Sequence, residues 1–221
     1  MKPNSNPSPE PLGTDGLLHT FAASLTLLLL GLVLLLSATN LGRSFTTESQ
    51  RRDQVGRFPV AVPNFLTVNT KGDQIPLRQH LAGDGRVMIV DFVYTRCQSL
   101  CSSLASIYQQ LQADIVARGL SNQVGLLSIS FDPLNDQPQA LATYAARLGM
   151  QPQVWQILSL TSTQDRRALL GAFGIMVIPA PLGEFEHNAA LHLVTSRGDL
   201  VRIMDYASPN LALSAALALK P

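Results

Sequence analysis

The sequence predicts an α/β sandwich built around a mixed β-sheet, preceded by an N-terminal transmembrane helix. From Phe58 onward, apolar runs typical of strands alternate with segments whose apolar residues recur at helical spacing. The last pair of strands is a hairpin, which adds an antiparallel part to the sheet. Ahead of this region lies an apolar segment long enough to cross a bilayer.

Charged residues are scarce in this chain. The 16 Lys and Arg and 15 Asp and Glu make up 14% of its 221 residues, against roughly 25% in an ordinary soluble domain. A net charge of +1 and scattered aromatic residues give no basis for binding nucleic acid. Two cysteines exclude a disulfide-rich scaffold and a four-cysteine zinc site.

The apolar segment spans residues 17–38 and contains no Asp, Glu, Lys or Arg. A cleavable signal peptide is the alternative, but its apolar core would be shorter, and Lys2 is the only Lys or Arg ahead of this segment. We therefore expect an uncleaved membrane anchor. A disordered tail over residues 1–16 precedes it, a polar linker over 39–57 follows, and one domain occupies 58–221.

The elements of the domain are predicted in order. Residues 64–77 predict a hairpin around a Lys-Gly-Asp turn, and Val87–Tyr94 is the apolar run expected of a strand buried on both faces. A helix over 99–118 and a second buried strand, Val124–Phe131, follow. The rest is predicted as a helix over 137–149, a short apolar run at 154–160, a helix over 164–173, a hairpin of 189–194 and 200–204, and a helix over 209–219.

The two cysteines lie where the first buried strand ends. Cys97 is expected on the loop after that strand, and Cys101 one helical turn later on the same face. Open α/β sheets bind ligands at the carboxyl ends of their strands. The helix N-terminus, with Arg96 beside it, would favour thiolates. The pair could form a disulfide, hold a soft metal ion or be structural, and its spacing alone leaves these readings open.

A third metal ligand would come from the histidines. His187 follows an acidic segment, 183–186, which is expected to be a flexible loop that brings the imidazole over the cysteines. His192 lies inside the next strand and is expected to be structural. His80 is expected to be solvated in a polar turn, and His19 lies in the membrane segment.

Three blocks of the sequence, in this order, resemble the Sco/SenC family: FVYTRCQSLC, SISFDPLNDQP and FEHNAALHLVTSRGDLVRI. These are membrane-tethered, thioredoxin-like proteins involved in copper delivery to cytochrome c oxidase, so the resemblance implies a thioredoxin-like three-layer sandwich. By position, Cys97 and Cys101 match the paired cysteines of the family, and His187 matches its metal-binding histidine. Ser102 departs from the pattern, because the family commonly has proline there.

Two acids belong to the Asp-Pro-x-x-Asp segment of the family. Asp132 matches its first aspartate, and either forms a turn or lies in an outer shell near the cysteines. Asp136 matches the second and is expected to N-cap the helix that begins near Gln137, with Gln139 as its reciprocal capping partner.

The resemblance implies a copper metallochaperone that binds Cu(I), and leaves Cu(II) binding open. Two thiolates and one imidazole suit Cu(I) better than magnesium or calcium, whereas zinc would need a fourth ligand. A reduced pair could instead reduce the copper-binding cysteines of the oxidase, so a thiol–disulfide reductase is the alternative. A tethered interaction domain with a structural disulfide is the third reading. The implied partners are the copper-binding subunit of the oxidase, other copper chaperones and thiol reductants.

The implied location is a bacterial inner membrane, crossed once, with the domain in the periplasm, because an oxidase copper centre is served from that side. The charges flanking the anchor argue the other way. Lys2 precedes it and four arginines follow it between Arg43 and Arg57, which by the positive-inside rule would keep the domain in the cytoplasm. We give the implied function more weight, because flanking charge can be overridden by a long translocated domain.

Overall fold

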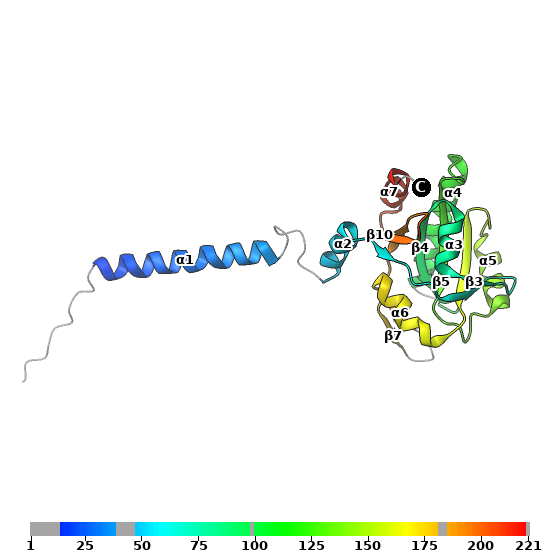
Figure 1. Cartoon of the computed structure of the whole chain (residues 1–221), viewed down its shortest axis with the longest axis horizontal. Coiled ribbons are helices and arrows are strands. Elements are labelled where there is room, and N and C mark those ends of the chain that lie inside the picture. The colour runs from blue at the N-terminus through cyan, green and yellow to red at the C-terminus, as the bar shows by residue number, and fades with distance from the viewer. Residues whose placement is uncertain (1–13, 39–46, 98–99, 181–184, 220–221) are drawn as a thin grey trace, which may run out of the picture. The chain divides into compact units, whose positions relative to one another are not determined.

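The structure is a computed structural model that describes residues 14–38, 47–97, 100–180 and 185–219 (Figure 1). For residues 14, 15, 47 and 100–102 it describes the backbone alone. The chain divides into two units, Met1–Gln50 and Arg51–Pro221. Residues 1–13 and 39–46, which hold most of the predicted tail and part of the predicted linker, lie outside the described residues.

The first unit contains helix α1, Thr14–Ala38. Its residues 16–38 have a mean hydropathy of 2.4, and the described side chains of this stretch are exposed all round. A helix this apolar on every side, and not covered by protein, has lipid as its natural surroundings. By length and composition it could cross a membrane, as the sequence predicts.

Helix α2, Thr47–Arg57, occupies much of the segment for which the sequence predicts a polar linker. Its Val55 is 4% exposed and belongs to the core of the second unit. The Arg51 guanidinium donates a hydrogen bond to the carbonyl oxygen of Ala172, over 3.3 Å. The packing of the domain therefore begins ahead of Phe58. One buried valine in a polar helix leaves no apolar periodicity in the sequence, which is why this helix is not predicted.

A mixed sheet of eight strands forms the centre of the domain within the described residues, in the order β1-β10-β9-β4-β5-β6-β2-β3. The central strands β4, β5 and β6 run parallel, and the other neighbours are antiparallel. A separate antiparallel ribbon consists of β7 and β8. The strands are β1 (Val60–Ala61), β2 (Leu66–Val68), β3 (Gln74–Pro76), β4 (Val87–Val93), β5 (Val124–Ser130), β6 (Trp155–Leu160), β7 (Val177–Pro179), β8 (Phe185–His187), β9 (Leu191–Val194) and β10 (Asp199–Met204).

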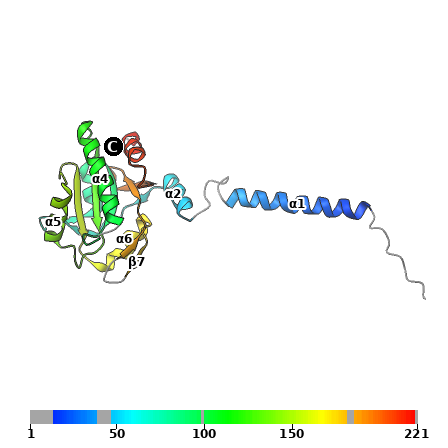
Figure 2. The ribbon, with the colours of Figure 1, turned by 180° about the vertical axis from the view of Figure 1, so that it is seen from behind.

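Helices cover both faces of the sheet. Side chains alternate between the faces along β4: Val90 packs in one core cluster with residues of α3 and α6, and Ile89 packs in another with residues of α4 and α7. Figure 1 shows the sheet from the side of α3, and Figure 2 from the side of α4. The predicted three-layer sandwich is confirmed. The helices are α3 (Leu77–Asp84), α4 (Leu100–Ala117), α5 (Pro138–Leu148), α6 (Thr163–Phe173) and α7 (Pro209–Ala218).

Two histidines outside the predicted site have structural surroundings. His192 is buried in β9 as expected, with its ring nitrogens 3.2 Å and 3.1 Å from the carbonyl oxygens of Val90 and Phe173. Burial lowers the pKa of His192 to about 4, although its bonds to the two carbonyls raise it. His80 lies on α3, which the sequence did not predict, and its Nε2 is 2.8 Å from Oε1 of Gln156. The expectation of a solvated turn was wrong for His80.

A carboxyl group is buried in the middle of β4. Asp91 is 1% exposed and faces α4, and its Oδ1 has no hydrogen-bond partner among the described residues. Burial raises the pKa of Asp91 to about 7, although its interactions with Ser128 and Tyr108 lower it. The folded domain therefore carries a proton here that an exposed aspartate would have lost.

This proton makes stability depend on pH in a direction that can be measured. Above the ordinary aspartate pKa of 3.8 the unfolded chain releases the proton, whereas the folded chain holds it up to about pH 7. The contribution of Asp91 to stability is thus full below pH 3.8 and is lost as pH rises through 7. The uncharged Asp91→Asn removes this loss. We expect its free energy of unfolding, minus that of the wild type, to grow by about 4 kcal/mol between pH 4 and 8.

Urea unfolding of both proteins across this range checks the expectation. His192→Gln is a useful contrast because His192 has the opposite sign: its contribution is present above pH 6.5 and is lost as pH falls through about 4. A difference between Asp91→Asn and the wild type that stayed constant with pH would show that Asp91 is already ionised in the folded protein.

Candidate functional site

Three segments that are distant in sequence meet past the carboxyl ends of β4 and β5. Tyr94 follows β4 directly, Phe131 follows β5 directly, and their ring centroids are 5.6 Å apart. Strand β8 packs on both rings: the centroid of Phe185 is 5.3 Å from that of Tyr94, and the centroid of His187 is 5.3 Å from that of Phe131. The four rings form an aromatic cluster at the sheet edge where α/β proteins bind ligands.

Cys97 lies beside this cluster, on the turn between β4 and α4, where the sequence places it. Its backbone N–H donates to the carbonyl oxygen of Tyr94, over 3.2 Å, which closes the turn tightly. The side chain is 8% exposed and belongs to the same core cluster as Tyr94 and Phe131. The sulfur therefore borders the apolar interior instead of projecting into solvent.

Cys101 lies in the first turn of α4, four residues after Cys97, as the sequence predicts for the backbone. Its side chain lies outside the described residues, as do residues 98 and 99 of the connecting segment. The assignment of both sulfurs to one metal ion or one disulfide therefore stays a prediction.

His187 ends strand β8, opposite Val177 of β7. Its Nδ1 is 3.0 Å from the carbonyl oxygen of Asn188. Because that oxygen can only accept, Nδ1 carries the ring hydrogen and Nε2 carries the lone pair of the neutral ring. Burial lowers the pKa of His187, although the Asn188 carbonyl raises it. The imidazole is thus held in the neutral form that a metal requires.

The hydroxyl of Tyr94 links strand β8, which carries His187 (the histidine strand), to the turn after β4, which carries Cys97 (the cysteine turn). The hydroxyl of Tyr94 lies 3.2 Å from both the backbone nitrogen and the carbonyl oxygen of Phe185, so it accepts from one and donates to the other. The expectation of a flexible loop ahead of His187 was wrong for Phe185 and Glu186, because β7 and Tyr94 hold them in a strand. Residues 181–184 lie outside the described residues.

Asp136 does not cap α5, so this expectation was wrong. Gln137 is the N-cap residue, since Pro138 occupies the first helical position, where proline is favoured. The Asp136 carboxylate instead accepts hydrogen bonds from the backbone N–H of Thr95 (2.9 Å), the hydroxyl of Thr95 (2.5 Å) and the hydroxyl of Ser130 (2.5 Å). Burial raises the pKa of Asp136, although these hydrogen bonds lower it. Asp136 thereby binds the turn before Cys97 to the end of β5.

Asp132 forms a turn, which is one of the two roles that the sequence left open, and its outer-shell role near the cysteines stays a prediction. Its carbonyl oxygen accepts turn hydrogen bonds from the N–H groups of Asn135 and Asp136, over 3.1 Å and 2.9 Å. Its buried carboxylate lies 3.2 Å from the guanidinium of Arg96 and 3.6 Å from that of Arg166. The sequence assigned the Arg96 charge to the cysteines, but the structure pairs it with Asp132.

Among the described side chains, no three His, Cys, Asp or Glu groups lie close enough together to hold a metal ion. Of the three predicted ligands, Cys97 shares a core cluster with Tyr94 and Phe131, and the ring of His187 contacts both of their rings. The third, Cys101, has no described side chain. Sequence reasoning missed Tyr94 and Phe131, which contact the ring of His187, because apolar runs at strand ends look like ordinary core.

The SCO1/SenC family profile matches residues 56–219. The SCO1 protein homolog of Bacillus subtilis (strain 168) is 26% identical over 143 residues, which is 64% of this chain and 72% of that protein.

Solved structures share the fold. BsSco, a member of the Sco family of cytochrome c oxidase assembly proteins with an identified disulfide switch, has a TM-score of 0.60 and 24% identity, covering 74% of this chain and 96% of its own. Copper-bound ScoI from Arabidopsis thaliana has a TM-score of 0.60 and 16% identity, covering 72% of this chain and 98% of its own. At these identities the likeness shows the fold, which is the thioredoxin-like sandwich that the sequence predicts.

The hydrogen bonds of Asp136 predict a large loss of stability on truncation. Asp136→Ala leaves three donors around the turn without their acceptor, so we expect the free energy of unfolding to fall by about 3 kcal/mol. Asp114→Ala, at an exposed site on α4, is the matched control and should change it by less than about 0.5 kcal/mol. Urea unfolding at pH 7 measures the free energy of unfolding of both variants. A value for Asp136→Ala equal to that of the wild type would show that the hydrogen bonds of Asp136 do not stabilise the fold.

Proposed function

The chain belongs to the SCO1/SenC family, and from this premise we propose that it is a membrane-tethered carrier of Cu(I). Its ligands would be Cys97, Cys101 and His187, and its target the dinuclear copper centre of cytochrome c oxidase. The observation that carries the proposal is the aromatic cluster of Tyr94, Phe131, Phe185 and His187, which joins the histidine strand to the cysteine turn.

The chemistry of these groups suits the cargo. Two thiolates and one imidazole nitrogen are a soft donor set of low coordination number, which Cu(I) accepts and hard divalent ions do not. His187 is neutral and its Nε2 bears the lone pair, so no proton has to leave the ring before a metal binds. Both sulfurs must be reduced and deprotonated, which makes loading depend on redox state and pH. Whether the same three groups also bind Cu(II) is a separate measurement.

Relatives support the cargo and the target. A member of the family from Arabidopsis thaliana has a solved structure with copper bound. BsSco belongs to a family of cytochrome c oxidase assembly proteins. The partners we propose are therefore the copper-binding subunit of the oxidase, and other copper chaperones or thiol reductants that load and reduce the site.

The alternative function is a thiol–disulfide reductase that keeps the copper-binding cysteines of the oxidase reduced. The spacing of Cys97 and Cys101 across the start of α4 favours it, and so does the disulfide switch identified in BsSco. In this reaction the dithiol of the chain would be oxidised to a disulfide, while a target disulfide is reduced to two thiols. The histidine has no part in that exchange, which allows the two functions to be separated.

Copper binding separates them through one set of variants. We expect the reduced full chain to bind one Cu(I), measured anaerobically by competition with a chromophoric chelator. We expect copper binding to weaken at least about 100-fold in each of Cys97→Ser, Cys101→Ser and His187→Ala, because each change removes a group that would bind the ion directly. His80→Ala, a histidine on α3, should bind as the wild type does.

Disulfide reduction is then assayed on the same proteins with a peptide disulfide. The reductase alternative predicts that both serine variants are inactive and that His187→Ala keeps its activity. Unchanged copper affinity in His187→Ala, together with retained disulfide reduction, would refute the carrier and leave the redox dithiol.

We further propose that α1 anchors the chain in a bacterial inner membrane with the domain in the periplasm. The length and hydropathy of residues 16–38 support the anchor. A phosphatase reporter that is active only after export, fused after Pro221, should be active in this orientation. A reporter that works only in the cytoplasm should be silent at the same position. The reverse result would place the domain in the cytoplasm, which is the orientation that the arginines after α1 favour.

A further inference from the structure

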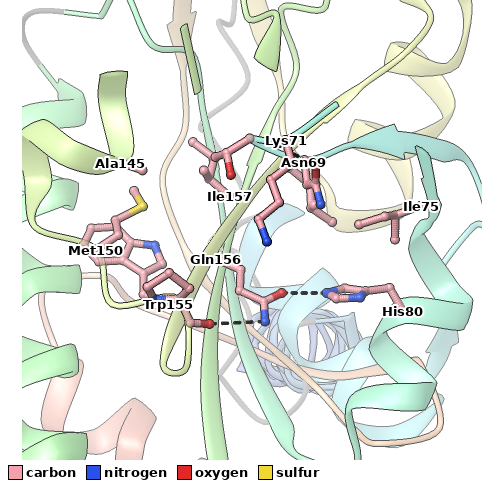
Figure 3. Close-up of a pocket in the computed structure, with 12 residues that line it drawn as sticks. Asn69, Lys71, Ile75, His80, Ala145, Met150, Trp155, Gln156 and Ile157 are labelled. Carbon is pink, nitrogen blue, oxygen red and sulfur yellow. Dashed lines mark hydrogen bonds between the residues drawn. The ribbon is translucent and has the colours of Figure 1, made fainter. Parts of the chain in front are cut away.

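A cavity of about 400 Å³ lies between β6, the β2–β3 hairpin and the end of α5 (Figure 3). It exists because β2 pairs with β6 only through Thr67 and Val68, opposite Leu160 and Ser159. The side chain of Asn69 then accepts from two N–H groups of the hairpin tip and turns the chain away. Within the described residues, the first half of β6 is therefore left without a neighbouring strand on this edge.

The walls of the cavity are mostly apolar. Trp155 is held in place because its Nε1–H donates to the hydroxyl of Ser128, over 2.9 Å. The apolar side chains that line the cavity come from β3, α5, β6 and the loop after α5: Ile75, Ala145, Met150, Trp155, Ile157 and Leu158. The space lies within the range of about 300–1,000 Å³ that small-molecule sites occupy.

Five polar residues also line this space: Asn69, Thr70, Lys71, His80 and Gln156. The amide nitrogen of Gln156 faces the carbonyl oxygen of Pro152, over 3.4 Å, so the amide oxygen faces His80 and accepts from its Nε2–H, over 2.8 Å. That contact fixes the orientation of the amide. Its nitrogen keeps a second hydrogen for another acceptor.

Lys71 supplies a positive charge that has no counter-charge in the cavity. Figure 3 shows its ammonium group directed toward Gln156. No Asp or Glu lines the cavity, and no ion pair joins Lys71 to an acid among the described residues. The nearest acid along the hairpin, Asp73, accepts from the side-chain nitrogen of Asn69, over 2.9 Å. An ammonium directed over an apolar cavity favours an anion whose body is apolar.

We propose that this cavity binds a small organic carboxylate with an aliphatic body. The carboxylate would lie between the ammonium of Lys71 and the amide nitrogen of Gln156. The aliphatic body would pack against Trp155 and Met150, which lie on the other side of the cavity in Figure 3. The site uses neither cysteine nor His187, so it stands apart from the copper proposal and can fail or hold independently of it.

Trp155 provides the readout, because it is the single tryptophan of the chain. The full chain is reconstituted in phosphatidylcholine vesicles and titrated with hexanoate, and in parallel with hexanamide, which has the same body without the charge. We expect hexanoate to change the tryptophan emission saturably. Hexanamide should bind at least about tenfold more weakly, because a hydrogen bond to a charged group is lost.

Variants test the two parts of the site. Lys71→Met should weaken hexanoate at least about tenfold and leave hexanamide unchanged, whereas the matched Lys71→Arg should keep hexanoate binding. Ala145→Leu should abolish the response to both, because its side chain fills the cavity. Lys71 is exposed on a hairpin tip, and unchanged melting temperatures of its variants would show that they are folded.

Three results would overturn the proposal. The first is the absence of a saturable response to hexanoate up to about 10 mM, because a dissociation constant above this is too weak for a specific site. The second is an equal affinity for hexanoate and hexanamide. The third is an unchanged hexanoate affinity in Lys71→Met. Either of the last two would show an apolar cavity without an anion site.

Discussion

The arrangement at the end of the sheet depends on one phenol. The Tyr94 hydroxyl accepts from and donates to the backbone of Phe185, so the ribbon that carries His187 is fastened to the residue that begins the cysteine turn. The turn closes back on Tyr94 through the N–H of Cys97. The two candidate ligand segments are about 90 residues apart in the chain, and they share this single side chain as a common support.

The surroundings of the site combine fixed charges with a neutral histidine. Asp132 engages the guanidinium groups of Arg96 and Arg166, and Asp136 is enclosed by hydroxyl and N–H donors. His187 is neutral in a half-buried position. Acids and bases near the turn therefore largely satisfy one another, which leaves a soft, weakly charged environment.

The sequence predicted the parts of the fold that have strong periodicity and missed those that depend on tertiary contact. The buried strands β4 and β5 and the long helix α4 follow from their apolar patterns. Helix α2 was missed because Val55 is the only one of its described side chains in the core clusters. The role of Asp136 was misjudged because a carboxylate before a helix resembles a cap, and only the folded chain brings Thr95 and Ser130 to it. The aromatic contacts that join the strand of His187 to Tyr94 and Phe131 could not be read from spacing at all.

The burial of Cys97 has a kinetic consequence. Cys97 is 8% exposed as a residue, whereas exchange with a disulfide-bearing peptide needs room for three sulfur atoms nearly in line. A bare ion needs far less space. A macromolecular disulfide would therefore need a greater exposure of Cys97 than an ion does.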